Sequence, residues 1–186
     1  MRNLIWLESE RLILRDHVEA DFESHHELIS NEKNMYYMPE VLTHSLKESR
    51  ENFNVTLNAS KEEKRSKYFL RIETKDGIHV GEIGYSITSF TPLGNMGELG
   101  YFIREEMQKK GYASEAAKRL IEFAFKEGGL IRLYCSCLKE NAPSEALMKK
   151  IGLIKEAELK DYEYHDGKLK TRVIYRLLKD EYAYET

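Results

Sequence analysis

The chain of 186 residues has only two cysteines and three prolines, and it has no long hydrophobic run. No segment approaches the roughly 20 apolar residues that a membrane-spanning helix needs. The N-terminus also lacks an apolar stretch followed by small residues, which a secretory signal would show. These absences predict a cytoplasmic protein without a membrane partner.

The few candidate metal ligands are not arranged as a metal site. Cys135 and Cys137 lie two residues apart in a predicted strand, so they share one face and are poorly placed to bridge each other. No second cysteine pair could complete a zinc site, and the H-E-x-x-H motif is missing. The histidines without metal-ligand spacing include His25, His26, His79 and His165. We therefore predict packing thiols in a reducing compartment, packing or surface histidines, and no metal.

The chain also lacks a strong charge of either sign. Its net charge of −3 argues against a general nucleic-acid binder held by phosphate contacts. Hydrophobic residues make up 41% and charged residues 33%, as in globular proteins. The length fits one domain over residues 1–186 with a substantial core. A mildly acidic protein suits a cationic amine substrate, although so weak a bias decides little.

Apolar residues follow strand and helix periods in alternation. We expect strands at 11–15, 98–103 and 131–138, and hairpins joining 68–73 to 78–87 and 153–164 to 169–178. We expect helices from Val18 to near Asn31, after the capping box Ser45-x-x-Glu48, over 112–127, and from Pro143 to near Gly152. Residues 61–67 suggest a solvated charged loop, and the apolar pattern suggests a bulge beside Gly81. This order predicts an α/β domain with a central mixed sheet and a ligand crevice at the carboxyl ends of its middle strands.

The most informative segment is Gln108-Lys109-Lys110-Gly111-Tyr112-Ala113, between a predicted strand and a predicted helix. The first turn of a helix has free N–H groups and the positive end of the macrodipole, so it favours anions. Gly111 allows close approach of a bulky anion and can adopt a positive φ. The segment therefore predicts a pyrophosphate site, although an ordinary connection with a solvated basic loop is the alternative.

This segment resembles the coenzyme A loop Q/R-x-x-G-x-G/A of the GNAT acetyltransferases. Three distant segments match the same family in its order and spacing: Glu10-Arg11-Leu12-Ile13-Leu14-Arg15 with Ala20-Asp21, Gly97 to Ile103, and Asn141-Ala142-Pro143-Ser144 with Lys150-Ile151-Gly152-Leu153. They are similar to the "ERLxLR…D", "xEIGYxI" and "NxxS…KxGF" segments of the RimJ/RimL-like subgroup, which acetylates the N-termini of ribosomal proteins. The resemblance covers roughly residues 8 to 178 and is specific in combination.

The resemblance implies the GNAT fold, with a central mixed, mostly antiparallel sheet, splayed middle strands that admit the pantetheine arm, and flanking helices. It also implies acetyl-CoA as co-substrate. The cofactor-binding residues that it implies are Tyr101, Phe102, Ile103, Gln108, Lys109, Lys110, Gly111, Tyr112, Ala113, Ser114 and Asn141. A backbone N–H near Phe102 or Ile103 would stabilise the oxyanion.

Acetyl transfer to an amine requires a neutral amine and benefits from a proton for the leaving thiolate. Glu98 is the preferred candidate base, because family members often carry a catalytic glutamate where the strand to the cofactor loop begins. The alternatives are a surface glutamate without a catalytic part, Glu82 on the neighbouring strand, or a water chain. Many family members place an acidic tyrosine where this chain has Met148, so the resemblance leaves Ser144 as the candidate acid. Asn141 and Ser144 could instead cap the short helix.

We therefore predict a GNAT N-acetyltransferase that transfers an acetyl group from acetyl-CoA to a primary amine in a ternary complex. The acceptor is a protein N-terminal α-amine or a small-molecule amine, and the protein is a possible homodimer. The alternatives are a non-catalytic acyl-CoA-binding sensor and an ordinary α/β partner-binding domain. The sequence leaves the acceptor and the oligomeric state open.

Overall fold

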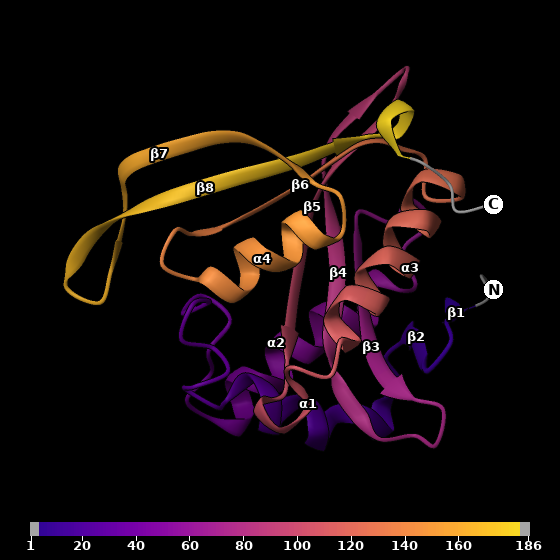
Figure 1. Cartoon of the computed structure of the whole chain (residues 1–186). Coiled ribbons are helices and arrows are strands. Elements are labelled where there is room, and N and C mark those ends of the chain that lie inside the picture. The colour runs from indigo at the N-terminus through magenta and orange to yellow at the C-terminus, as the bar shows by residue number, and fades with distance from the viewer. Residues whose placement is uncertain (1–3, 183–186) are drawn as a thin grey trace. The chain divides into compact units, whose positions relative to one another are not determined.

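The computed structural model describes residues 4–182 (Figure 1). Over these residues the chain forms a mixed α/β fold with eight strands in a mostly antiparallel sheet and four α-helices. Two compact units make up the described chain, residues 4–86 with 100–120 and residues 87–99 with 121–182. The fold class predicted from the sequence is confirmed. No helix among the described residues is long and apolar enough to cross a membrane.

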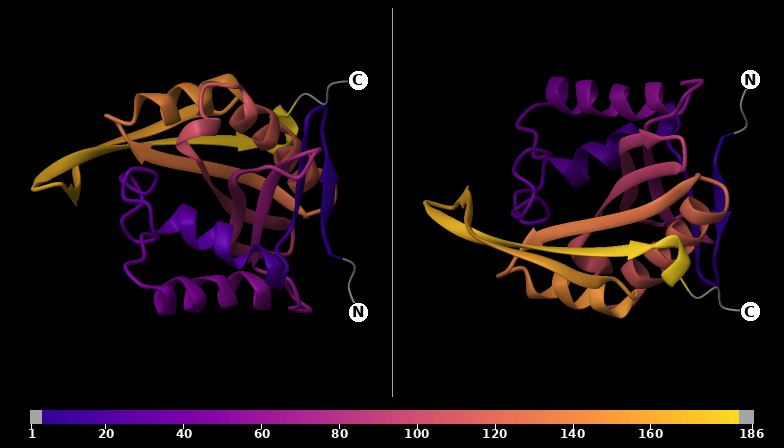
Figure 2. Two further views of the ribbon diagram at one scale, coloured as in Figure 1. Left: turned by 90° about the horizontal axis from the view of Figure 1, so that it is seen from below. Right: turned by 90° about the horizontal axis from the view of Figure 1, so that it is seen from above.

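In the first unit, strands that follow one another along the chain pair in antiparallel fashion. They are β1 (Trp6–Glu8), β2 (Leu12–Asp16), β3 (Lys67–Thr74) and the first part of β4 (His79–Thr91). The helices α1 (Phe22–Ile29) and α2 (Leu46–Ala59) lie side by side (Figure 2). Ser45 caps α2 by accepting a hydrogen bond from the Glu48 N–H at 3.2 Å, as the capping box predicts. The short β1 was not predicted.

The hairpin of β3 and β4 confirms two local expectations. Its turn contains Gly77 at φ +88°, and the strand register shifts where Gly81 faces Ile72. A Cβ atom at Gly81 would lie 2.3 Å from the carbonyl oxygen of Phe102. A glycine is therefore required there, because any side chain would collide with backbone.

The charged segment 61–67 is only partly the solvated loop that its composition suggests. Residues 61–64 are exposed, but Arg65 is buried. Its Nη1 and Nη2 atoms donate to the two carboxylate oxygens of Asp16 at 3.0 and 2.6 Å. The prediction was wrong for Arg65 because its partner lies 49 residues away, in β2.

In the second unit, four strands lie in the order β5, β6, β8 and β7. The part of β5 (Gly94–Ile103) that belongs to this unit runs parallel to β6 (Leu130–Leu138), and β8 (Lys168–Leu178) pairs antiparallel with both β6 and β7 (Ile154–His165). Helix α4 (Ala142–Lys150) lies beside these strands (Figure 2). Cys135 and Cys137 are free, buried thiols, as predicted. Helix α3 (Tyr112–Lys126) starts in the first unit and ends in the second.

Candidate cofactor loop and active site

The predicted cofactor loop lies in the first unit, between a 3-10 turn at Glu105–Met107 and the start of α3. Residues 108–111 are exposed, and the loop has positive φ at Lys109 (+59°) and at Gly111 (+83°). The expectation that Gly111 adopts a positive φ is therefore confirmed. Successive N–H groups in such a turn form a concavity that accepts anions, and the turn runs directly into the first turn of a 15-residue helix.

Two side chains hold the ends of this loop. The side-chain amide of Gln108 donates to the Ile103 carbonyl at 3.1 Å, which ties the loop to the end of β5. The Ser114 hydroxyl donates to the Gly111 carbonyl at 2.8 Å. The structure thus places Ile103 beside Gln108, and the role of these residues in cofactor binding stays a prediction.

The remaining predicted cofactor residues of β5 are Tyr101 and Phe102. Both are half-buried, whereas Ile103 is 8% exposed. The Phe102 carbonyl lies where Gly81 allows β4 to approach closely. At this point Gly81 therefore allows the close approach of two backbones, β4 and β5.

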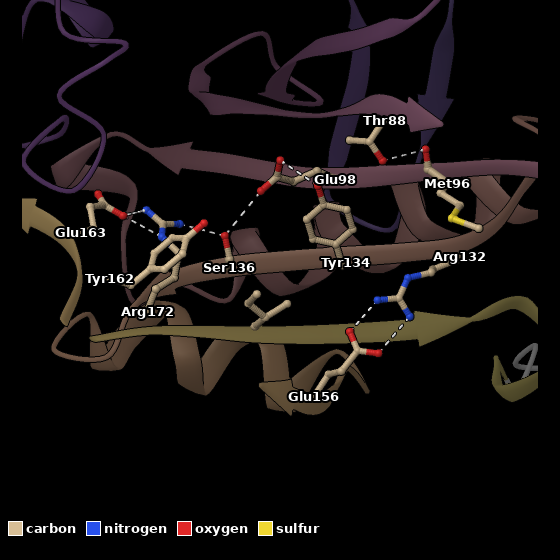
Figure 3. A pocket seen from close by; sticks show the side chains of 11 residues that line it. Thr88, Met96, Glu98, Arg132, Tyr134, Ser136, Glu156, Tyr162, Glu163 and Arg172 are labelled. Carbon is tan, nitrogen blue, oxygen red and sulfur yellow. Dashed lines mark hydrogen bonds and ion pairs between the residues drawn. The ribbon is translucent and has the colours of Figure 1, made fainter. Parts of the chain in front are cut away.

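Glu98 lies in the second unit, on a pocket of about 630 Å³ formed by residues of β4 to β8 (Figure 3). The Tyr134 hydroxyl donates to Glu98 Oε2 at 3.2 Å, and the Ser136 hydroxyl donates to Glu98 Oε1 at 3.4 Å. The Arg172 guanidinium donates to the Ser136 oxygen at 2.8 Å and pairs with Glu163. A chain of hydrogen bonds therefore leads from Glu98 across β6 to β8 and β7.

The pocket contains three carboxylates, and they differ in their partners. Glu156 pairs with Arg132, and Glu163 pairs with Arg172 (Figure 3). Glu98 receives its hydrogen bonds from two hydroxyl groups instead. Burial and the Glu98 charge both raise the pKa of Tyr134. Glu98 is thus the carboxylate of this pocket whose charge no arginine neutralises in the described structure.

Asn141 and Ser144 also lie in the second unit, at the start of α4. The Asn141 side chain accepts a hydrogen bond from the Ser144 backbone N–H at 3.3 Å, so Asn141 is the N-cap. The Ser144 hydroxyl hydrogen-bonds the Cys137 thiol, whose pKa burial raises. Capping, one of the two alternatives for this pair, therefore holds for Asn141, and the serine side chain is directed to β6 instead.

Met148, which occupies the position of the family's acidic tyrosine, is fully buried in the second unit. Its thioether cannot donate a proton. Met148 therefore cannot supply the proton for a leaving thiolate.

Glu82, the rival base, lies in a buried polar cluster of the first unit. Its Oε1 atom is 2.6 Å from His25 Nδ1 and 3.7 Å from His17 Nε2. Burial alone would raise the pKa of Glu82, but the two histidines outweigh it and the pKa is lowered. A buried carboxylate paired in this way is a poor base for an external amine.

This cluster was not predicted from the sequence, because His17, His25 and Glu82 are separated by up to 65 positions and have no motif spacing. Each residue has one atom that could ligate a metal ion, and these three atoms lie within 4.8 Å of one another. The 2.6 Å contact has the length of a charge-assisted hydrogen bond. The cluster is thus a hydrogen-bonded ion pair of Glu82 and His25, with His17 beside it.

The family model of the acetyltransferase (GNAT) domain matches residues 11–154. The chain is 29% identical over 175 residues to the uncharacterized N-acetyltransferase YnaD of Bacillus subtilis, which covers 94% of this chain and 97% of YnaD. It is 33% identical over 110 residues to the putative ribosomal N-acetyltransferase YdaF of the same organism, over 59% of each chain.

Solved structures agree with these matches. A GNAT acetyltransferase from Bacillus anthracis superposes with a TM-score of 0.79 at 28% identity, over 95% of this chain and 100% of that one. RimL, a ribosomal L7/L12 α-N-protein acetyltransferase in complex with CoA, has a TM-score of 0.82 at 20% identity, over 95% and 99%. The spermidine N-acetyltransferase of Vibrio cholerae, in complex with CoA and spermine, has a TM-score of 0.81 at 20% identity, over 93% and 98%. The chain therefore belongs to the GNAT family of acetyl-CoA-dependent N-acetyltransferases, with RimJ/RimL-like proteins among its relatives.

Proposed function

We propose that this acetyltransferase passes the acetyl group of acetyl-CoA directly to a primary amine, with Glu98 as the general base. The environment of Glu98 supports this proposal best. Its carboxylate lies on a pocket and has hydroxyl partners, so it can accept a proton. The rival carboxylate, Glu82, is buried and already paired with His25.

The proposed reaction has one displacement and two proton transfers. Glu98, directly or through one water, takes a proton from the ammonium form of the acceptor. The neutral amine attacks the acetyl carbonyl carbon, and the resulting oxyanion is stabilised by a backbone N–H near Phe102 or Ile103. The C–S bond then breaks, and the nitrogen gives up its second proton, which reaches the thiolate of CoA through Ser144 or water, so that the products are the neutral amide and the CoA thiol.

The residues of the first unit would hold the cofactor in this mechanism. The N–H groups of loop 108–111 and the start of α3 would bind the pyrophosphate. Lys109 and Lys110 would add positive charge, and the resemblance to the family implies that Asn141 contacts the pantetheine. Each of these proposed roles can be tested by substituting the residue concerned.

The acceptor that we propose is cationic before it reacts, as a protein N-terminus or a small polyamine is. Glu98 supplies negative charge without an arginine partner, which favours an ammonium group over a neutral or anionic one. The similar proteins include both ribosomal-protein and spermidine acetyltransferases. We further propose that the protein forms a homodimer and does not bind nucleic acid directly.

A thiol-release assay tests the proposed function. Purified protein is incubated with acetyl-CoA and with N-terminal peptides, polyamines, aminoglycosides or free amino acids, and free CoA thiol is measured. We expect acceptor-dependent thiol release with a positively charged amine, and mass spectrometry should show an added acetyl group on that amine. Tight CoA binding in calorimetry without thiol release for any amine would contradict the proposal and indicate an acyl-CoA sensor.

A further inference from the structure

Arg11, from the first segment that resembles the family, contacts the cofactor loop. Its Nη1 atom donates to the Lys110 carbonyl at 3.1 Å, and its guanidinium carbon lies 4.8 Å from the centre of the Tyr112 ring. A Cβ atom at Gly111 would lie 3.3 Å from Arg11 Nη2, the one heavy atom near that position. The arginine thus lies against three successive residues of the loop, although it is 99 residues from Lys110 in sequence.

Glu115, in the first turn of α3, holds Arg11 in this place. Its Oε2 atom accepts from Nε and Nη2 of Arg11, both at 2.7 Å. Its Oε1 atom accepts from the Arg11 backbone N–H at 2.7 Å and from the Ser9 hydroxyl at 2.8 Å. The carboxylate is therefore saturated by one short segment, and the guanidinium is fixed in a fork geometry that a lysine could not reproduce.

The backbone conformation of the loop explains why such support is needed. Lys109 adopts φ +59° although it has a side chain, and Gly111 adopts φ +83°. An L-residue in the left-handed region costs free energy, so it persists where surrounding contacts favour it. The Lys110 carbonyl, between these two residues, is the atom that Arg11 holds.

We propose that Arg11, fixed by Glu115, is a positioning residue that keeps loop 108–111 in the conformation that binds the phosphates of CoA. This inference rests on the proposed role of the loop in the proposed function. The proposed mechanism assigns no role to the segment from Glu10 to Arg15. This inference gives that segment a role in cofactor binding.

The test compares two acetyl donors, acetyl-CoA and acetyl-pantetheine, which keeps the thioester and lacks the pyrophosphate. For Arg11→Ala we expect the KM for acetyl-CoA to rise roughly fivefold, as for loss of a favourable exposed ion pair, with kcat near wild type. With acetyl-pantetheine the variant and the wild type should have the same kcat/KM. Glu115→Ala should give the same pattern, and the double variant should be no worse than either single variant, because both remove one clamp.

Arg119→Ala is the matched control. Arg119 lies on the same helix, four residues after Glu115, and donates to the Glu8 carbonyl of β1 at 3.0 Å. Its KM for acetyl-CoA should stay within twofold of wild type. Arg11→Lys, which keeps the charge and loses the fork, should recover less than half of the lost affinity.

Two outcomes would overturn the inference. The first is an unchanged KM for acetyl-CoA in folded Arg11→Ala, and the second is an equal loss with both donors, which would indicate general damage to the enzyme. Calorimetry with CoA distinguishes failure of this inference about Arg11 from failure of the proposed function. If wild-type protein does not bind CoA, the loop assignment and the inference fall together. If the wild type binds and Arg11→Ala binds equally well, the inference alone is wrong.

Discussion

The Nδ1 atom of His25 lies 2.6 Å from a carboxylate oxygen of Glu82, and both side chains are buried in the first unit. Nε2 of the same ring faces the Asn52 side-chain oxygen at 3.2 Å. With both ring nitrogens facing oxygen atoms, the cationic form of His25 is favoured. Burial would lower the pKa of His25, but Glu82 more than offsets it, so the pKa is raised.

Glu82→Gln should therefore lower the free energy of unfolding. Removing one partner of a buried ion pair leaves the other charge uncompensated, which costs about 3–5 kcal/mol. Urea unfolding followed by circular dichroism measures the change. Glu122→Gln, which breaks an exposed pair with Lys126 on α3, is the control and should cost less than about 0.5 kcal/mol. Equal stability of the two variants would contradict the ion-pair interpretation.

The same pair predicts a pH dependence. The pKa of Glu82 is lowered in the folded state, so its contribution is present above its ordinary pKa of 4.5 and is lost as the pH falls through the folded-state value. The pKa of His25 is raised, so its contribution is present below its ordinary pKa of 6.5 and is lost as the pH rises through the folded-state value. The stability difference between wild type and Glu82→Gln should therefore be largest between pH 4.5 and 6.5. A difference that stays constant from pH 4 to pH 9 would contradict this assignment.

Glu98→Gln should impair turnover without weakening the binding of CoA. The variant keeps the size of the side chain and can still hydrogen-bond Tyr134 and Ser136, but it cannot accept the proton. We expect kcat/KM for the amine to fall on the order of 10²-fold. The rate should recover in part at high pH, where more of the amine is already neutral. Wild-type kcat/KM with the same pH profile would remove Glu98 from the mechanism and leave a water chain as the next candidate.

Gly111→Val should weaken CoA binding. The position has φ +83°, which a β-branched residue rarely adopts, and the added side chain would approach the Arg11 guanidinium. We expect at least a tenfold loss of CoA affinity, on the order of 1.4 kcal/mol. Calorimetry measures it, and circular dichroism confirms the fold. Gly77→Val is the control, because Gly77 has a similar φ of +88° but lies in the turn between β3 and β4, so the variant should affect stability alone.

The roles of Asn141 and Ser144 can be distinguished by two single variants. Asn141→Ala removes the N-cap of α4 and should lower the free energy of unfolding by about 1 kcal/mol. Ser144→Ala leaves the cap in place, since Ser144 contributes its backbone N–H, and should lower kcat with little change in CoA affinity. Stopped-flow thiol release measures kcat. A normal kcat in Ser144→Ala would leave water as the acid.

Local patterns in the sequence determined most of the elements of this fold. The capping box before α2, the Asp76-Gly77 turn and the glycine of the cofactor loop each depend on a few adjacent residues, so their conformations could be predicted from those residues alone. The family segments likewise indicated acetyl-CoA, because a pyrophosphate loop is a local structure.

Tertiary structure alone decided which of the candidate side chains meet. Glu82 and Glu98 both lie on predicted strands, and only packing made the first a buried partner of His25 and left the second on a pocket. Arg11 meets Glu115 across 104 positions, and Arg65 meets Asp16 across 49. Such contacts have no period or spacing in the sequence, because they depend on how distant strands and helices come together after each has formed.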